Sequence, residues 1–557
     1  MANSMTLAFV ITSSSWFFLL VESSPRIIFP DGIIEGRYFI TESGRNISAF
    51  IGIPYAVPPV NDLRFKNPIP FGSWNGTLLA NKDGNMCPQF RNGVVIGDEN
   101  CLFLNVYTPL LPGNETVIEE LLPVMVWIHG GAYTRGSGTL ADYNPSYLMD
   151  KDIVLVTLNY RLGILGFLST GDDQASGNFG LKDQVVALQW VQQRIKYFQG
   201  DPDRVTVSGT SAGGGSVNLL ALSDLTTGLF HQFIIQSGSA LSSWGYYKNS
   251  NYVEKAKLVG KYLNCPTKNS SYLVTCLRNI NADKIIDTHS AFDMLSSLSN
   301  LIWGPTDEQE GEGAFITDDP ANLLANGKLK DFPFISGLNR DEGLLITNYL
   351  YGNKTITGFA MRHLDLVLQF VLRLYVKSDN IKTVTAQIKK FYFGNGELQN
   401  ETLFINSYTK CLEDISFFYP EIRLLEFHLK SGSNPSYFYL FNYRSVSTMN
   451  PIYKYYDTSR GIPHGVEVMF LFPQQDPFVV LNDDDRMIKN LMVEIWTNFV
   501  ITGFPRSDAL GDPDMWNPYF KKRSYLQIGN DTKPTISLHN SFYNDRMDFW
   551  KASMEHV

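Results

Sequence analysis

The segment around Ser211 restricts the fold of this chain more than any other. It runs from an apolar stretch over 205–207 into Gly209-Thr210-Ser211-Ala212-Gly213 and then into a predicted helix. Small residues on both sides of Ser211 permit a crowded, strained turn that would raise the serine hydroxyl above a sheet. The pattern predicts an α/β fold with Ser211 as the candidate nucleophile and the Ala212 N–H as a candidate donor to a developing oxyanion. The alternative is a tight glycine-rich turn without chemistry.

Other apolar runs agree with an α/β fold. Continuous apolar runs are typical of strands buried on both faces of a parallel sheet, and they lie at 124–128, 153–158, 205–207, 233–235, 334–335 and 436–441. A helical stripe of apolar residues covers 183–198, and 32–46 has the turn residues of a short β-hairpin. These elements predict a mostly parallel, twisted sheet with helices on both faces. We expect the less regular stretch over 249–332 to form helical insertions that cap the sheet.

A second glycine turn supplies further candidate oxyanion donors. His129-Gly130-Gly131-Ala132 follows the apolar run 124–128. Backbone N–H groups that no side chain obstructs can line an oxyanion hole, where one donor typically contributes about 3 kcal/mol. The sequence therefore predicts that Gly131 and Ala132 donate beside Ala212. A purely structural turn at a strand end is the alternative.

A serine nucleophile needs a base, and His464 is the best placed of the eight histidines. In doubly wound hydrolases the order along the chain is serine, acid, histidine. His464 follows Ser211 and lies in the loop Gly461-Ile-Pro-His464-Gly465, which leaves its ring free to reach the nucleophile. The acid is expected after the predicted strand that runs into Gly337. There Asp341 and Glu342 are both candidates, since either could orient the imidazole and stabilise its cation.

The N-terminus has the pattern of a secretory leader. Residues 5–21 are mostly apolar and small residues follow at 23–24, which predicts a signal peptide over 1–23 and a single catalytic domain over 24–557. An uncleaved anchor is the alternative. No later segment has about 18 consecutive apolar residues, and the C-terminus does not resemble a GPI signal. We therefore expect a secreted, extracellular chain without a stable membrane anchor.

Cysteines and glycosylation motifs agree with an oxidising compartment. In such a compartment Cys87 with Cys101, and Cys265 with Cys276, could each close a short loop worth about 3 kcal/mol. Cys411 then remains, either as a buried free thiol or in an intermolecular disulfide. Seven N-x-S/T sequons predict glycosylation, and they lie at Asn46, Asn75, Asn114, Asn269, Asn353, Asn400 and Asn530.

The composition excludes other classes of function. Hydrophobic residues make up 44% of the chain and charged residues 18%, as in an ordinary globular protein and not in a disordered one. The formal net charge is −9 and no basic run occurs, so the chain lacks the positive footprint that a nucleic-acid partner requires. No CxxC motif is present, which argues against a zinc or redox site.

Together these motifs resemble the type-B carboxylesterases, the cholinesterase-like branch of the α/β-hydrolase fold. The resemblance covers nearly the whole mature chain. In its overall sequence the chain looks most like secreted arthropod carboxylesterases. Besides the turn at Ser211, it rests on FIGIPYA at 50–56, ENCLFLN at 99–105, NYR at 159–161, GNFGLKDQ at 177–184, ALQW at 187–190, RDEG at 340–343 and HG at 464–465.

The resemblance implies a serine esterase that hydrolyses small-molecule carboxylic esters through an acyl-enzyme, without a metal or an organic cofactor. It implies that Glu342, and not Asp341, completes the triad with Ser211 and His464. It also implies two disulfides and two ion pairs that brace loops near the site, namely Cys87–Cys101, Cys265–Cys276, Arg64–Glu99 and Arg161–Asp183.

Two departures from the family pattern bear on the substrate. Residue 210 is Thr, where cholinesterases carry Glu, and the loop between Cys87 and Cys101 has no Trp to hold a quaternary ammonium group. We therefore do not expect a choline ester as the substrate. The alternatives are a juvenile-hormone-type or other narrow esterase, a lipase, and a catalytically silent, neuroligin-like adhesion protein. The complete set of candidate catalytic residues argues against the last, and the oligomeric state is left open.

Overall fold

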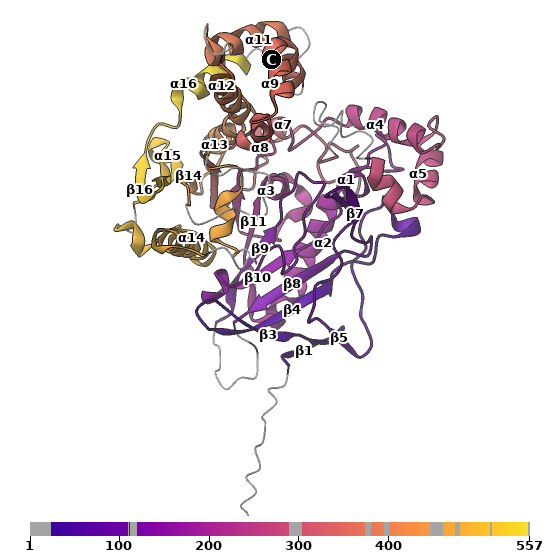
Figure 1. Cartoon of the computed structure of the whole chain (residues 1–557). Coiled ribbons are helices and arrows are strands. Elements are labelled where there is room, and N and C mark those ends of the chain that lie inside the picture. Colours follow the sequence, from indigo (N-terminus) through magenta and orange to yellow (C-terminus); the bar gives the residue numbers. More distant parts are fainter. Residues whose placement is uncertain are drawn as a thin grey trace, which may run out of the picture.

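The computed structural model describes residues 24–109, 111, 120–288, 303–373, 380–394, 400–445, 460–473, 480–512 and 515–554. The predicted signal peptide and the sequon at Asn114 lie outside these ranges. Figure 1 shows a twisted sheet flanked by helices, with a further group of helices at the end of the molecule opposite strand β1.

The main sheet has eleven strands in the order β16-β15-β14-β13-β12-β11-β9-β10-β8-β4-β3. The strands from β15 to β10 in this order are parallel, whereas β16 at one edge and β8, β4 and β3 at the other are antiparallel. These strands are β3 (Arg37–Ile40), β4 (Asn46–Pro54), β8 (Phe103–Thr108), β9 (Leu122–Ile128), β10 (Val154–Leu158), β11 (Gly200–Thr210), β12 (Gln232–Gln236), β13 (Phe334–Asn339), β14 (Ser436–Tyr443), β15 (Tyr525–Asp531) and β16 (Lys533–His539).

Two small sheets stand beside the main one. One has the order β1-β2-β5 and the other pairs β6 with β7. Their strands are β1 (Arg26–Phe29), β2 (Gly32–Glu35), β5 (Thr77–Leu79), β6 (Gln89–Arg91) and β7 (Val94–Ile96).

Strand β9 shows why the apolar runs are continuous. Val124 and Val126 point into one core together with side chains of α2 (Phe179–Arg194) and α3 (Ala212–Leu222). Met125 and Trp127 point into a second core on the other face, together with side chains of α14 (Asp483–Thr502). Because successive side chains of a strand alternate between faces, a strand with helices on both sides must be apolar throughout.

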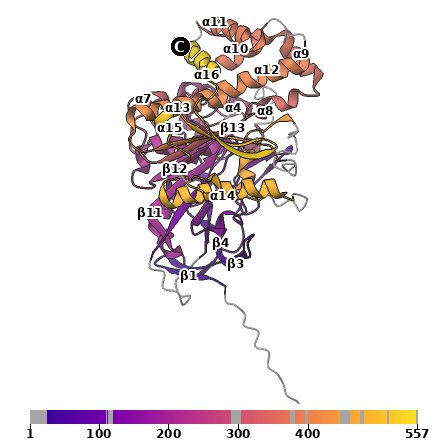
Figure 2. The same ribbon diagram turned by 90° about the vertical axis from the view of Figure 1, so that its left-hand side faces the viewer.

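The remaining helices lie mostly in the insertions between strands. Figure 2 shows α9 to α12 and α16 gathered above the sheet, on the side away from β1 and β3. The bounds are α1 (Gly163–Phe167), α4 (Asn249–Tyr262), α5 (Ser270–Arg278), α7 (Pro320–Ala325), α8 (Leu344–Thr347), α9 (Lys354–Arg362), α10 (Leu364–Leu372), α11 (Ile381–Ile388), α12 (Glu401–Glu413), α13 (Tyr419–Ser431), α15 (Tyr519–Lys522) and α16 (Asn544–Met554).

The α/β fold class, each predicted strand of the sheet and the helical stripe over 183–198 are confirmed, the last with an earlier start, and one local prediction is wrong. The helix predicted over 183–198 begins at Phe179 and ends at Arg194, and a short 3-10 turn follows. The hairpin predicted over 32–46 is divided between sheets, because β2 pairs with β1 and β5 whereas β3 pairs with β4. The helical insertions expected after residue 249 are present as α4, α5 and α7.

Covalent and ionic braces are present where the resemblance implies them. The structure forms the disulfides Cys87–Cys101 and Cys265–Cys276, and the thiol of Cys411 is free and buried. The ion pairs Arg64–Glu99 and Arg161–Asp183 are also present, the second with an Nη2–Oδ1 distance of 2.7 Å. Among the described residues, no helix combines the length and apolar character that crossing a membrane requires.

Candidate active site

Ser211 lies between the end of β11 and the start of α3, with φ 57° and ψ −125°. This conformation is costly for a residue with a side chain, and such strain is typical of functional turns. The flanking glycines allow it. A Cβ atom on Gly209 would lie 2.6 Å from the Gly213 carbonyl carbon, and one on Gly213 would lie 2.1 Å from the Ile128 carbonyl oxygen. The small residues predicted from the pattern are therefore required by backbone packing.

The turn after β9 lies directly against this serine. A Cβ atom on Gly130 would lie 3.0 Å from Ser211 Cβ. Gly131 has φ 114° and Ala132 has φ 55°, and the N–H groups of Thr134 and Arg135 both donate to the Gly131 carbonyl. These bonds fix an unusual backbone path, which brings the turn that contains the candidate donors Gly131 and Ala132 beside Ser211.

His464 and Glu342 are in contact. His464 Nδ1 lies 2.6 Å from Glu342 Oε2, and both side chains are almost fully buried. The other oxygen, Oε1, accepts hydrogen bonds from the Ser237 hydroxyl and the Asn339 N–H. Asp341 points elsewhere, because its Oδ2 accepts from the Ile462 N–H at 2.7 Å. The geometry therefore distinguishes between the two acids that the spacing in the sequence offered, since of the two only Glu342 contacts the imidazole.

The remaining ring nitrogen of His464 is available for chemistry. Its Nε2 has no hydrogen-bond partner within the described part of the chain, and the Phe417 ring packs against the imidazole with centroids 4.9 Å apart. A carboxylate on Nδ1 fixes the tautomer that leaves Nε2 free to accept a proton.

His129 has a different role. Its Nδ1 lies 2.7 Å from the Gly130 carbonyl, and its ring stacks on Tyr160 at 4.4 Å. Burial lowers the pKa of His129 to about 4, so the ring is neutral at neutral pH and belongs to the turn, as the sequence indicated.

Two further buried carboxyl groups lie near Glu342. Glu467 accepts from Asn339 Nδ2 and from Gln236 Nε2, and burial followed by the charge of Glu342 raises its pKa. Glu421 bonds to the Ser336 hydroxyl. Burial raises the pKa of Glu421 to about 8, with Glu342 acting in the same direction and the Ser336 bond opposing it. Burial therefore raises the pKa of both carboxyl groups next to Glu342.

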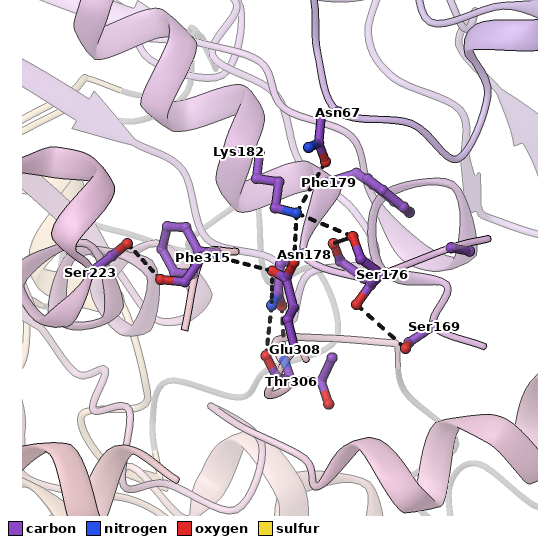
Figure 3. A network of polar contacts seen from close by, with 12 residues as sticks. Asn67, Ser169, Ser176, Asn178, Phe179, Lys182, Ser223, Thr306, Glu308 and Phe315 are labelled. Carbon is purple, nitrogen blue, oxygen red and sulfur yellow. Dashed lines mark hydrogen bonds and ion pairs between the residues drawn. The ribbon is translucent and has the colours of Figure 1, made fainter. Parts of the chain in front are cut away.

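A buried ion pair lies at the start of α2, where Figure 3 shows Lys182 pointing into a group of oxygen atoms. Lys182 Nζ donates to Glu308 Oε2 at 2.6 Å, to Asn67 Oδ1 at 3.0 Å and to Ser176 Oγ at 3.2 Å. Glu308 Oε1 accepts from Asn178 Nδ2 at 2.9 Å. All three ammonium protons are thus used, which a buried charge requires.

This ion pair anchors residues 303–316, which we call the strap. Asn178 holds the strap through both the N–H and the carbonyl of Thr306, and Glu308 also accepts from the Phe315 N–H. Two residues before Thr306, a Cβ atom on Gly304 would lie 3.3 Å from the Tyr133 ring. Since Tyr133 directly follows Ala132, the strap supports the turn that carries the candidate oxyanion donors.

The sequence did not single out several residues that the structure brings to the site: Ser237, Asn339, Glu467, Glu421 and Phe417. A weak signal existed for Glu467, an acidic residue three positions after His464. Ser237 directly follows β12, and Asn339 is the last residue of β13, at the edge where the site lies. Phe417 lies in the π-helical turn Asp414–Phe418 between α12 and α13, an irregularity that sequence patterns do not reveal.

The predicted glycosylation sites are spread over the surface. The described sequon asparagines are all exposed, namely Asn46, Asn75, Asn269, Asn353, Asn400 and Asn530. Three of them cap helices, because their Oδ1 atoms accept from the N–H of Tyr272, Ile356 and Leu403.

Comparison with known proteins gives consistent results. The model of the carboxylesterase family matches residues 23–550. Esterase E4 of Myzus persicae is 38% identical over 90% of this chain and 89% of its own, and juvenile hormone esterase of Tribolium castaneum is 35% identical over 97% and 96%. Neuroligin-3 of Mus musculus is 31% identical, with 66% of its length covered. The crystal structure of Manduca sexta juvenile hormone esterase with covalently attached OTFP superposes with a TM-score of 0.83 at 25% identity, over 95% of this chain and 99% of that one.

Proposed function

The chain belongs to the carboxylesterase family and is a carboxylic-ester hydrolase, and on this premise we propose that it is a secreted serine esterase that uses Ser211, His464 and Glu342. The observation that carries the proposal is the 2.6 Å contact between His464 Nδ1 and Glu342 Oε2, at the strand edge that also bears Ser211.

The proposed reaction has two halves. Ser211 Oγ attacks the ester carbonyl while His464 Nε2 takes the hydroxyl proton, and the N–H groups of Gly131, Ala132 and Ala212 hold the oxyanion. The imidazolium gives its proton to the departing alcohol, which leaves an acyl group on Ser211. Water then attacks the acyl carbon, its proton passes through His464, and the carboxylic acid is released. Glu342 stays ionised throughout and stabilises the imidazolium.

Two features support a neutral ester as substrate. Thr210 places a methyl and a hydroxyl group, and not a carboxylate, beside Ser211. The loop between Cys87 and Cys101 offers no Trp for a quaternary ammonium group. The similarity to juvenile hormone esterases favours a narrow esterase of that kind as a second candidate with the same mechanism.

Secretion is supported by the apolar leader, by two disulfides and by the exposure of the described sequon asparagines. We propose glycosylation at these six positions and at Asn114, and a single catalytic domain over 24–557 after removal of 1–23. Mass spectrometry of the secreted chain before and after deglycosylation tests both.

The decisive experiment treats the secreted protein with an organophosphate and follows hydrolysis of nitrophenyl esters of increasing acyl length. We expect saturable hydrolysis that stops with one phosphoryl group on Ser211, and no hydrolysis by Ser211→Ala. Ser73→Ala, at an exposed serine away from the site, is the matched control. Full activity of Ser211→Ala would refute the mechanism, and a folded wild type that neither hydrolyses nor reacts would favour a neuroligin-like binding role.

A further inference from the structure

A groove of about 680 Å³ lies outside the candidate active site and is lined by residues of α13, α15 and α16. None of its lining residues belongs to the candidate triad or to the turn at Gly131. Its volume is in the range of small-molecule sites, which are usually 300–1,000 Å³.

The groove has an apolar floor between two helix faces. Tyr519, Phe542 and Met547 are buried at the floor. On α13, Arg423 and Phe427 lie four residues apart and therefore on the same face of the helix.

None of the described sequon asparagines lines the groove, so glycans attached at those positions would not start from its walls.

The rim is cationic although the chain as a whole has a net charge of −9. Five basic residues and two acidic ones line the groove. One acid is already compensated, because Arg523 binds both carboxylate oxygens of Glu426 at 2.7 and 3.0 Å. The Arg423 guanidinium lies over the Phe427 ring at 5.6 Å, and Lys430 Nζ lies over the same ring at 5.9 Å. Two cations are thus held at the edge of the apolar surface.

We propose that this groove binds a long-chain carboxylate, with the headgroup among Arg423, Lys430 and Lys522 and the alkyl chain on the floor formed by Tyr519, Phe542 and Met547. An apolar floor beside a cationic rim is complementary to a molecule that joins one negative charge to an apolar tail. Ester hydrolysis releases molecules of this class, so the groove would allow the enzyme to bind its own type of product away from the reaction centre. Binding itself does not depend on the proposed catalytic residues.

The test measures binding of decanoate to the full secreted chain by isothermal titration calorimetry, after organophosphate treatment has blocked Ser211. Decyl maltoside, which has the same alkyl chain without the charge, is the comparison ligand. The test variant is Lys430→Gln/Lys522→Gln, at two exposed rim residues, and the control variant is Lys328→Gln/Lys533→Gln, at two exposed lysines outside the groove.

We expect one decanoate per chain, weaker binding of decyl maltoside, and a roughly fivefold loss of decanoate affinity in the rim variant. The control variant should bind as the wild type does, and both variants should hydrolyse nitrophenyl esters normally. Equal decanoate affinity in the rim variant and the wild type would overturn the proposal. A second result would also overturn it: no decanoate binding, together with a dimer seen by sedimentation that the rim substitutions dissociate. In that case a second copy of the chain would fill the groove. Failure of the organophosphate to react would count against the proposed catalytic function alone, since the comparison of variants does not use Ser211.

Discussion

Replacing Lys182 by methionine should destabilise the folded protein by about 3–5 kcal/mol, the usual cost of leaving one member of a buried ion pair alone. Lys182 and Glu308 are only 4% and 5% exposed. Without the ammonium group, Glu308 Oε1 keeps its bonds from Asn178 Nδ2 and the Phe315 N–H, whereas Oε2 loses its donor. The cost arises from this unpaired buried charge, and a neutral residue at 308 should remove most of it.

The assay is thermal unfolding followed by circular dichroism at one fixed scan rate, since large secreted proteins often unfold irreversibly. For a domain of this length the unfolding entropy is about 1.1 kcal/mol per kelvin, so the midpoint should fall by roughly 3–5 °C. Lys182→Met/Glu308→Gln should recover most of the shift. Lys257→Met is the matched control, because it breaks an exposed lysine–glutamate pair worth only about 0.3–0.5 kcal/mol.

The refuting result is a double variant that unfolds at the same temperature as Lys182→Met. In that case the loss of stability would come from the lost packing of the lysine side chain and not from the unpaired Glu308 carboxylate. The strap provides a second readout. Because it packs on Tyr133 next to the candidate oxyanion donors, kcat for a nitrophenyl ester should fall more than KM rises in Lys182→Met.

Three further outcomes are expected. Glu342→Gln should lower kcat/KM by roughly 10³-fold or more, because the neutral amide cannot stabilise the imidazolium, whereas Asp341→Asn should lose at most about tenfold; the reverse order would overturn the assignment of the acid. Glu421 has a pKa of about 8 in the folded protein against an ordinary 4.5, so the folded state holds an extra proton between these pH values and its stability falls as the pH rises through them. In Glu421→Gln the unfolding midpoint should therefore fall less between pH 4.5 and 8 than in the wild type. An equal dependence of the midpoint on pH in both proteins would contradict this assignment. Gly131→Ala should reduce kcat at least about 100-fold, because its Cβ would lie 2.0 Å from the Arg135 carbonyl oxygen. Gly72→Ala should not, because a Cβ atom there has nothing within 4 Å and the backbone is not in the left-handed region.

The parts of the fold that the sequence predicted are those with local causes. The strand at 124–128 is apolar because both of its faces are buried, and Gly209 and Gly213 are glycines because a Cβ atom at either position would meet backbone. Each of these causes acts within a few residues, so each leaves a readable pattern.

The parts that the sequence did not predict depend on distant contacts. Helix α2 begins at Phe179 because Asn178, in a left-handed conformation, pairs with Thr306 of the strap. Asp341 and Glu342 are neighbours in the sequence, so their spacing could not show which of them contacts His464. That contact depends on where the loop at 461–464 lies. Glu421 approaches Glu342 only through the packing of α13 on β13.

The three helix-capping sequon asparagines complicate a common experiment. Each Oδ1 atom of Asn269, Asn353 and Asn400 accepts a backbone N–H, while Nδ2 is the atom to which a sugar would be joined. Mutating such an asparagine to glutamine would delete the sugar and also a cap worth about 1 kcal/mol, so lower secretion could not be assigned to either loss. Substituting the hydroxyl residue of each sequon instead, as Ser271→Ala, Thr355→Ala and Thr402→Ala, abolishes the recognition motif and leaves the cap in place. The difference in yield between the two sets of mutants would then report the folding contribution of the caps alone.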